Sequence, residues 1–598
     1  MAETAVSAFV ARARADAALP ALRVLAAGGA ARDETITWGE WAGQSRAFAA
    51  SLIAAGHRPG QHVAILAGNA AAWPIADLGV LMAGGISVGV YPTSAPAQVR
   101  QLLADCAAVA VVVDSPAQME KVRAVRSTLP ELRTIIAVDH DGGGDAVSWA
   151  GWMQRGRALG ESVQTRAELA RRMDALRPDT TAILIYTSGS TGEPKGAALT
   201  HRTLLASAAS IRDTLGLVEG DRSLSFLPFC HAAERIFGLY TRIVCGMQAG
   251  LVADHNRVWD AAREFAPTLF GGLPRFYEKA VATLRAQQAA ASGDERSRWE
   301  RTLELGMERS RRKRAGQPVS VELETEWLRT GEPLLERARE LFGGRVRVAT
   351  SGGAALPADV SEYLDALGIT VLGAYGLTEH LCAAFNRPDH YTFDSAGPPM
   401  PGTTLRLAED GEILLRRGPL TFSGYHGRPA ETAEAFSADG EWLRTGDLGR
   451  VGEDGALRVI GRKKELIALS NGKKVAPLGI EAALTGEPWI EQAMLYGEGR
   501  NFVSALLVIR RPALEAWAAE HARDADDPRL LDDPGLRAAV QAAVDRVNAR
   551  LSNPERVRRF ALLGNGFSGD DLTPTLKLRR PVVEQRYRAH LEALYVDA

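Results

Sequence analysis

Short, almost wholly apolar runs alternate with amphipathic stretches over the first 140 residues of the chain. The runs at 62–66, 109–114 and 134–138 are typical of strands, and residues 41–55 have the spacing of an amphipathic helix. Strands that are apolar on both faces and separated by helices indicate a parallel sheet covered on both sides. The same alternation returns after residue 180. The pattern therefore predicts an α/β fold with mostly parallel sheets covered by helices.

Later segments depart from this pattern. Residues 285–335 are highly charged, which predicts a solvated helical excursion, although their basic run could instead contact an anionic membrane surface or CoA phosphates. Residues 400–460 are β-rich, with Asp-Gly pairs that are typical of hairpin turns. The shorter region after them contains both helical and strand patterns. We therefore expect a large N-terminal domain, 1–461, with a small β-rich subdomain, and a small α+β C-terminal domain, 462–598.

Composition and charge narrow the function classes. The chain has 598 residues and a net charge of −2, so it has no excess positive charge to recruit nucleic acid. Its four cysteines are widely spaced, which indicates reduced thiols rather than a disulfide framework or a zinc site. The apolar run at 78–91 is too short to span a membrane, and the first 16 residues lack the apolar core of a signal peptide. We expect a cytoplasmic protein, monomer or homodimer, with at most peripheral contact at the inner membrane face.

Residues 187–196 combine glycines, hydroxyl side chains and a lysine directly after an apolar, strand-like run. Glycine lets consecutive backbone N–H groups converge on an anion, and the other side chains add donors and a positive charge, so the expected ligand is a polyphosphate. The motif is not a Walker P-loop, because Lys195 precedes the last glycine and Ala197 stands where a hydroxyl is needed. A flexible surface loop is the alternative. The candidate phosphate-binding residues are Thr187, Ser188, Gly189, Ser190, Thr191, Gly192 and Lys195.

Five further motifs follow this loop in a fixed order. They occupy residues 351–357, 373–379, 442–449, 461–467 and 572–579. Together with the loop, they make nearly the whole chain resemble the acyl-adenylate-forming (AMP-binding) superfamily, which includes acyl-CoA synthetases, luciferases and nonribosomal-peptide adenylation domains. Leu576 precedes Lys577 where many relatives have glycine, and this version resembles the long-chain fatty acyl-CoA synthetase branch.

The resemblance implies an ATP site assembled from these motifs. Gly353 and Ala354 would lie beside adenine, and the ring of Tyr375 would stack on it. Thr378 would contact the α-phosphate, and Glu379 would offer a carboxylate oxygen to Mg²⁺. The remaining ATP- and AMP-binding candidates are Gly376, Asp447, Arg462 and Lys577, of which Asp447 and Arg462 would contact the ribose.

The resemblance also implies a mobile C-terminal domain. Lys577 would bridge the substrate carboxylate and the α-phosphate while acyl-AMP and pyrophosphate form. The domain would then pivot at Lys464, and Gly472, Lys473 and Lys474 would enter the channel for coenzyme A. The implied reaction is ATP-dependent activation of a fatty acid, followed by transfer of the acyl group to the CoA thiol with release of AMP.

The resemblance further implies that two segments border the acyl pocket. His231 and Arg235 lie in one of them, and His231 joins Lys577, Glu379 and Thr378 as a catalytic candidate, because it would sit beside the substrate carboxylate. Gly271 and Gly272 lie in the other, where the absence of side chains leaves room for an acyl tunnel. These features favour a medium- to long-chain fatty acid as the substrate.

Several alternatives remain open at this point. His380 and Cys382 replace small polar residues of many relatives near the expected carboxylate site, so a synthetase for a specialised carboxylic acid is possible. The tryptophan gate that some bacterial long-chain relatives have near Arg235 is absent, so that kind of gating is not expected here. An acyl-AMP ligase that loads an acyl carrier protein is a second alternative. A non-catalytic nucleotide sensor is disfavoured, because the expected charged residues of the motifs are all present.

Overall fold

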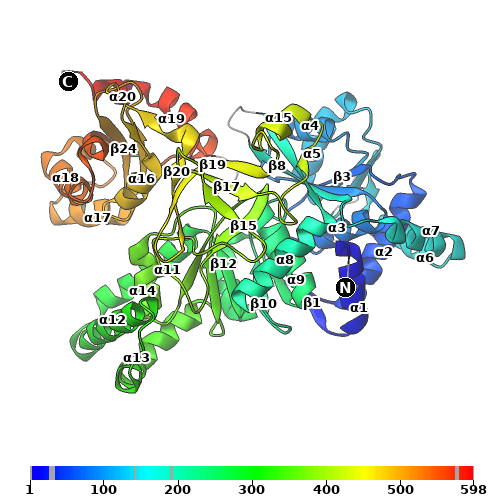
Figure 1. The fold of residues 1–598 in the computed structure, drawn as a ribbon, viewed down its shortest axis with the longest axis horizontal. Helices are drawn as coiled ribbons and strands as arrows, with labels where there is room; N and C mark the ends of the chain where they lie inside the picture. The colour runs from blue at the N-terminus through cyan, green and yellow to red at the C-terminus, as the bar shows by residue number, and fades with distance from the viewer. Residues whose placement is uncertain (1–2, 26–33, 140–142, 189–192, 573–577, 597–598) are drawn as a thin grey trace. The chain divides into compact units, whose positions relative to one another are not determined.

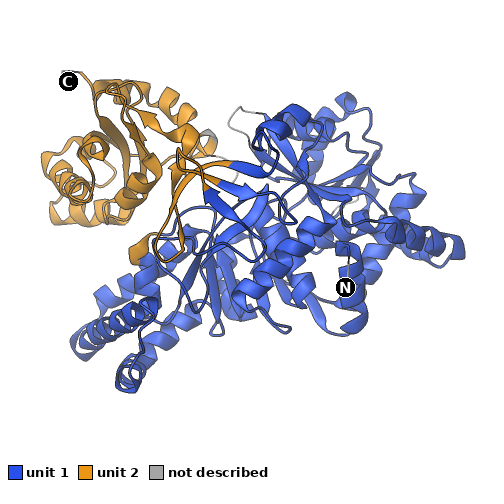
Figure 2. Ribbon diagram, viewed as in Figure 1, with its two compact units in different colours: residues 1–356, 360–406, 414–444 blue, residues 357–359, 407–413, 445–598 orange. Residues whose placement is uncertain are grey.

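The structure is a computed structural model that describes residues 3–25, 34–139, 143–188, 193–572 and 578–596 (Figure 1). The chain folds into two compact units (Figure 2). Unit 1 comprises residues 1–356, 360–406 and 414–444, and unit 2 comprises 357–359, 407–413 and 445–598. The division falls inside strand β19, Trp442–Val451. The domain boundary expected at 461/462 stays a prediction.

The first sheet of unit 1 has eight strands, in the order β18-β9-β8-β4-β3-β5-β6-β7. The six strands from β8 to β7 are parallel, and β9 and β18 continue the sheet in antiparallel pairing. The strands are β3 His62–Leu66, β4 Ile86–Val90, β5 Ala110–Val113, β6 Thr134–Ala137, β7 Val147–Ser148, β8 Thr181–Ser188, β9 Pro194–Thr200 and β18 Gly424–Tyr425. The predicted strands near 62, 109 and 134 are confirmed as β3, β5 and β6.

The second sheet of unit 1 also has eight strands, in the order β15-β14-β13-β12-β10-β11-β1-β2. Its central strands are parallel, while β15 and β2 close the two edges in antiparallel pairing. The strands are β1 Pro20–Val24, β2 Glu34–Thr37, β10 Arg222–Ser225, β11 Gln248–Leu251, β12 Leu269–Gly272, β13 Val348–Ser351, β14 Val371–Leu377 and β15 His380–Phe385. The predicted class, an α/β fold with mostly parallel sheets, is confirmed.

Helices connect these strands. The predicted amphipathic helix is α2, Trp38–Ala54, which begins at a capping box in which Thr37 and Glu40 satisfy each other's backbone N–H groups. The run expected to be a buried helix and strand is α3, Ala72–Met82, followed by β4, and every residue of α3 is buried. The other helices before residue 220 are α1 Ala5–Ala15, α4 Pro96–Asp105, α5 Pro116–Val125, α6 Trp149–Gly160, α7 Val163–Ala175 and α8 His201–Leu215.

The second half of unit 1 contains the charged segment. It folds into α12, Gly293–Arg314, and α13, Val321–Leu341, as the expected helical excursion. The excursion is only partly solvated, because Trp299, Leu305 and Trp327 are buried in the core of the second sheet. Many of the exposed positions carry charged side chains, and some of these pair across the helices, as Arg301 does with Glu326. The remaining helices are the π-helix Ala233–Tyr240, α9 Thr241–Cys245, α10 Val258–Phe265, α11 Pro274–Ala290, α14 Ala358–Ala366 and α15 Pro429–Glu434.

Unit 2 contains a three-stranded sheet with helices. Strand β24, Val503–Ile509, is buried at every position and lies between antiparallel β23, Ile490–Tyr496, and parallel β25, Val557–Leu563. Its helices are α16 Pro477–Thr485, α17 Arg511–Glu520, α18 Pro534–Asn548, α19 Arg580–Arg586 and α20 Arg588–Ala593. A separate four-stranded sheet, whose strands β16, β17 and β19 are each divided between the two units, has the order β16, Leu405–Leu407; β17, Glu412–Arg416; β19; and β20, Leu457–Arg462. Its Asp-Gly turns lie between the strands, as predicted.

Two general expectations can be compared with the described part of the chain. All four cysteines are buried and free, as expected for reduced thiols. None of the helices in the described ranges is long and apolar enough to cross a bilayer. The sequence did not predict β9, β18 or the π-helix, and all three lie at the candidate site.

Candidate active site

The described residues of the phosphate-loop motif lie on or beside the antiparallel pair of β8 and β9. Thr187 on β8 pairs with Lys195 on β9, and Tyr186 pairs with Gly196. A Cβ at Gly196 would lie 3.1 Å from the Tyr186 ring, so glycine is the residue that fits against this tyrosine. Gly189, Ser190, Thr191 and Gly192 lie outside the described residues. The described part of the motif therefore brings Lys195 back beside the strand that leads into the loop.

A hydrogen-bonded network holds the base of this hairpin. The Tyr186 hydroxyl donates to Asp105 Oδ2 at 2.6 Å, and Arg428 donates to Asp105 Oδ1 at 3.1 Å. Arg428 also lies 3.6 Å from the carboxylate of Glu193, the first described residue after the loop. Burial raises the pKa of Tyr186, so its hydroxyl stays a donor at neutral pH. The segment 424–428 thus fastens both strands of the hairpin.

Glu379 lies in the turn between β14 and β15, next to Thr378. The hydroxyl of Tyr425 donates to Glu379 Oε1 at 2.6 Å, and the Nζ of Lys195 lies 5.4 Å from the centroid of the same tyrosine ring. Burial and the negative charge of Glu379 raise the pKa of Tyr425. One tyrosine therefore joins the predicted metal ligand to the predicted phosphate-binding lysine.

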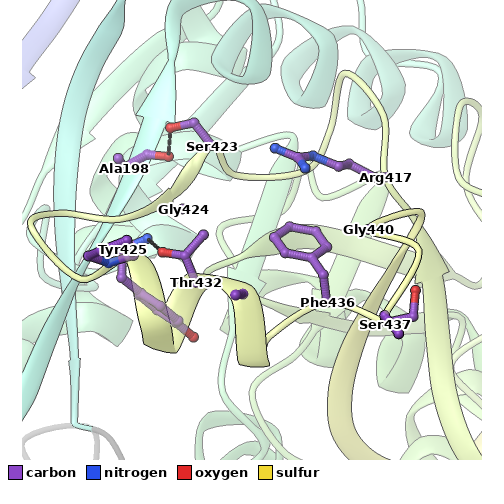
Figure 3. Close-up of a pocket in the computed structure, with 12 residues that line it drawn as sticks. Ala198, Arg417, Ser423, Gly424, Tyr425, Thr432, Phe436, Ser437 and Gly440 are labelled. Atoms are coloured by element: carbon purple, nitrogen blue, oxygen red, sulfur yellow. Dashed lines mark hydrogen bonds between the residues drawn. The ribbon is translucent and has the colours of Figure 1, made fainter.

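A pocket of about 570 Å³ adjoins this tyrosine (Figure 3). Figure 3 shows the Ser423 hydroxyl donating to the Ala198 carbonyl and the Tyr425 backbone N–H donating to Thr432 Oγ1. Phe436 lines the same pocket. These contacts fix the backbone on both sides of Gly424. They therefore also fix the position of the Tyr425 side chain.

The adenine-site candidates lie on or just after two adjacent parallel strands. Gly353 comes after β13, and Tyr375 lies on β14, its neighbour in the sheet. Gly353 has a φ of +81°, a left-handed conformation that glycine adopts at no steric cost, and Ala354 beside it is exposed. Position 376 requires glycine for a steric reason, because a Cβ there would lie 2.2 Å from the backbone nitrogen of Cys382. The ends of parallel strands are where α/β sheets commonly bind ligands.

The acyl-pocket candidates lie nearby in the same sheet. Gly271 and Gly272 end β12, which pairs with β13 at Thr350 and Ser351. A Cβ at Gly271 would lie 3.1 Å from the ring of Phe237, which comes from the π-helix. Phe237 was not singled out from the sequence, because only the π-helical register shows which way its ring faces.

His231 and Arg235 belong to the segment that begins the π-helix. The backbone N–H of Ala233 donates to His231 Nδ1 at 3.2 Å, which orients the imidazole. Arg235 is fully buried, forms an ion pair with Asp77 on α3 and donates to Ser87 Oγ on β4 at 2.7 Å. Its contacts place Arg235 in the core, where it anchors the π-helix to the first sheet.

A second buried ion pair anchors the π-helix to the other sheet. Glu234 lies 2.6 Å from Arg242, and it accepts a hydrogen bond of 2.7 Å from Ser225 on β10. Arg242 also donates to the Leu224 carbonyl at 3.0 Å. Buried charges are tolerated when they are paired and hydrogen-bonded, and here they hold a short, wide helix between two sheets.

In unit 2, the two ribose candidates lie opposite each other. Asp447 on β19 pairs with Arg462 on β20, and Arg462 Nε lies 3.1 Å from Asp447 Oδ1. The next residue, Lys463, pairs with Glu412 at 3.0 Å. Lys464 follows in a short 3₁₀ helix, Lys463–Glu465. The hinge candidate Lys464 thus lies two residues after Arg462, the last residue of β20.

The CoA-channel candidates form an exposed hairpin in unit 2. Gly472 and Lys473 lie between β21, Ile467–Ala468, and β22, Lys474–Val475. Gly472 has a φ of +79°, and all three candidates are exposed. Lys577 lies outside the described residues, and the described residues on either side, Leu572 and Leu578, form an isolated antiparallel bridge.

Comparisons with known proteins show that these motifs belong to one family. The family described as "AMP-binding enzyme" matches residues 9–426, and the "AMP-binding enzyme C-terminal domain" matches residues 464–598. The chain belongs to the AMP-binding enzyme family. Its family membership agrees with the resemblance carried by the six motifs.

Curated relatives in this family cover almost the whole chain. One is the long-chain-fatty-acid–CoA ligase FadD15 of Mycobacterium bovis, 35% identical over 573 residues, which are 94% of this chain and 92% of the relative. Another is the long-chain-fatty-acid–CoA ligase heimdall of Drosophila melanogaster, 31% identical over 94% of this chain and 90% of the relative.

Solved structures show the same fold. The anthranilate CoA ligase AuaEII, solved with anthranoyl-AMP, is 20% identical, covers 99% of this chain and 98% of its own, and has a TM-score of 0.75. The adenylation domain of a carboxylic acid reductase from Segniliparus rugosus is 21% identical over 99% of this chain and 94% of its own, with a TM-score of 0.74. At these identities the likeness concerns the fold.

Proposed function

We propose that this enzyme activates a medium- to long-chain fatty acid with ATP and transfers the acyl group to coenzyme A. The observation that carries the proposal is the meeting of Lys195 and Glu379 at Tyr425, because these two charged groups come from separate motifs of an adenylating enzyme. The curated relatives support the substrate class, since the bacterial and the insect relative are both named long-chain-fatty-acid–CoA ligases.

The first half-reaction joins two anions. The fatty-acid carboxylate attacks the α-phosphorus of ATP, the bond to the pyrophosphate oxygen breaks, and acyl-AMP and pyrophosphate form. Catalysis of such a step consists mainly of positioning and charge stabilisation. Lys195 would stabilise the leaving pyrophosphate, Thr378 would contact the α-phosphate, and Lys577 would bridge the reacting groups.

Glu379 is suited to hold Mg²⁺ in this step. Mg²⁺ usually binds through one or two carboxylates together with substrate phosphates rather than in an all-protein cage. Glu379 is a single carboxylate that contacts the same tyrosine as Lys195, which fits this mode of binding. When bound, Mg²⁺ would supply positive charge to the phosphate oxygens.

Unit 2 would serve both half-reactions. Asp447 and Arg462 would contact the ribose hydroxyls, and Lys464 would be the pivot between the two half-reactions. After the pivot, the exposed hairpin with Gly472, Lys473 and Lys474 would face the pantetheine channel. The CoA thiol would then attack the acyl carbonyl, and AMP would leave.

The acyl chain would enter between the π-helix and β12. His231 would lie beside the carboxylate, and Gly271, Gly272 and Phe237 would border the chain. We assign Arg235 a supporting place behind this pocket, because its guanidinium is committed to Asp77. We further propose that the enzyme works in the cytoplasm, with any contact at the inner membrane face being peripheral.

Pyrophosphate release across a panel of carboxylic acids tests the proposal. We expect Mg²⁺-dependent release with straight-chain fatty acids, optimal at medium to long chains, and acyl-CoA formation when CoA is added. Transfer only to an acyl carrier protein would instead identify an acyl-AMP ligase, and a preference for an aromatic or other acid would identify a specialised synthetase. No release with any acid would contradict the proposal.

A further inference from the structure

Tyr425 is placed to control how Glu379 offers its oxygens to a cation. Its hydroxyl donates to Oε1 of Glu379 at 2.6 Å, which uses one of the acceptor sites of that oxygen and fixes the orientation of the carboxylate. The tyrosine itself is held firmly: its backbone N–H donates to Thr432 at 2.8 Å, and its ring meets the Phe422 ring edge-on at 4.9 Å. The hydroxyl is therefore a fixed donor.

The number of oxygens that a carboxylate offers distinguishes two common cations. Mg²⁺ requires near-octahedral coordination at about 2.0–2.1 Å and keeps several waters, whereas Ca²⁺ takes six to eight oxygens and accepts bidentate carboxylates. A glutamate that is free to rotate can present both oxygens and so favour the larger ion. A glutamate with one oxygen hydrogen-bonded to a fixed hydroxyl cannot rotate freely and carries less negative charge on that oxygen, which favours coordination through the other oxygen.

We propose that Tyr425 is a positioning residue that makes Glu379 a one-oxygen ligand and thereby favours Mg²⁺ over Ca²⁺. The inference rests on the proposed function in one respect, namely that Glu379 receives the metal ion of the adenylation step. It goes beyond that function, because it assigns metal selectivity to a side chain outside the six motifs.

The contact of the Tyr425 ring with Lys195 can be separated by mutation from the hydrogen bond of the Tyr425 hydroxyl to Glu379. Lys195 lies over the aromatic ring, and the ring also lines the pocket of Figure 3. Tyr425→Phe keeps the ring and removes only the O–H group that reaches Glu379. Tyr391→Phe is a matched control, because the Tyr391 hydroxyl likewise donates to a carboxylate, Asp365 Oδ2, at 3.1 Å.

The decisive measurement is metal binding. Wild type, Tyr425→Phe and Tyr391→Phe are each saturated with an ATP analogue that cannot transfer its nucleotidyl group, and Mg²⁺ or Ca²⁺ is titrated calorimetrically. We expect the ratio of Ca²⁺ to Mg²⁺ affinity to rise about tenfold in Tyr425→Phe, the effect of one charge-assisted hydrogen bond, and to stay at the wild-type value in Tyr391→Phe. Ca²⁺ should correspondingly inhibit pyrophosphate release at lower concentration in Tyr425→Phe.

An unchanged affinity ratio in folded Tyr425→Phe would overturn the proposal, and so would an equal rise in Tyr391→Phe. If Tyr425→Phe does not fold, Thr432→Val provides a second test, because it removes the acceptor of the Tyr425 backbone N–H, leaves the metal ligand unchanged, and should loosen the placement of the hydroxyl and the metal selectivity with it. Failure of the proposed function is a different result: wild type would then release no pyrophosphate with any acid, whatever the metal.

Discussion

Arg462 lies directly across the β19–β20 pair from Asp447, and its Nε is 3.1 Å from Asp447 Oδ1. The aspartate is almost fully buried, at 7% side-chain exposure, whereas the arginine is 54% exposed. The arginine thus orients a carboxylate that cannot turn freely. In the proposed function both groups would contact one ribose, so they are pre-organised for it by contacting each other.

Asp447→Asn should therefore weaken ATP binding while leaving the fold intact. A charge-assisted hydrogen bond contributes about 1.5–3 kcal/mol, which corresponds to an increase of about 10- to 100-fold in the KM for ATP. Pyrophosphate release at varied ATP measures this. Asp454→Asn removes the partner of Arg458 in the same hairpin and should leave the KM unchanged. An equal rise of the KM for ATP in the two variants would mean that Asp447 stabilises the hairpin and does not contact the nucleotide.

The buried pair of Arg235 and Asp77 should be important for stability. Asp77→Asn or Arg235→Met leaves one buried charge without its partner, which costs about 3–5 kcal/mol of unfolding free energy. The double variant Asp77→Leu with Arg235→Met should recover part of the loss. Thermal unfolding checks both results, and Arg171→Ala, in an exposed pair with Glu168, should produce no measurable change. A double variant less stable than either single variant would contradict this account.

Gly376 should resist substitution for a reason independent of nucleotide. Gly376→Ala would place a Cβ 2.2 Å from the backbone nitrogen of Cys382, so β14 and β15 would have to separate, at a cost of about 3 kcal/mol. Denaturant unfolding without ATP measures the loss. Gly479→Ala, in helix α16 with nothing within 4 Å of its added Cβ, should be neutral or slightly stabilising. Full stability of Gly376→Ala would show that this turn can relax.

Stability should fall in mild acid partly because of His380. Burial lowers the pKa of His380 from 6.5 to about 4, and its two ring nitrogens contact Thr421 and Thr403. The unfolded chain therefore binds a proton between pH 6.5 and 4 that the folded chain does not, so stability decreases as the pH falls through this window. The slope from this one group is about 1.4 kcal/mol per pH unit. His380→Asn should reduce the slope of unfolding free energy against pH, and an unchanged slope would contradict the assignment.

The two half-reactions should be separable by mutation in unit 2. Lys577→Ala is expected to abolish acyl-AMP formation while sparing thioester formation from supplied acyl-AMP. Lys464→Pro should do the reverse, because proline fixes φ at the proposed pivot. Each half-reaction is measured alone, with pyrophosphate release for the first and acyl-CoA formation from acyl-AMP for the second. Equal loss of both activities in either variant would refute its assigned role.

Much of the scaffold could be predicted from the sequence, because the parallel strands are short, apolar and bounded by helices. The three predicted strands near 62, 109 and 134 are β3, β5 and β6, and the two candidates Lys195 and Glu379 could be named from their motifs. The pairing of β18 with β9 could not be predicted, since β18 has only two residues and no periodicity.

Tyr425 and Phe237 were missed for related reasons. Tyr425 reaches Glu379 only because Gly424 pairs with Ala198, a contact between segments far apart in the chain. Phe237 faces Gly271 only because its helix is a π-helix, which apolar spacing does not distinguish from an α-helix. The ion pair of Arg235 with Asp77 could not be predicted either, since a charged residue in a family motif suggested contact with the substrate rather than a buried ion pair.

The π-helix also affects how this enzyme can be compared and redesigned. One residue more or less in an α-helix turns all later side chains by about 100°. An aligned relative whose segment is α-helical would therefore present a different side chain to Gly271, even with identical residues at each aligned position. Substitutions borrowed from such a relative would point elsewhere, so the length of this segment has to be matched before its side chains are exchanged.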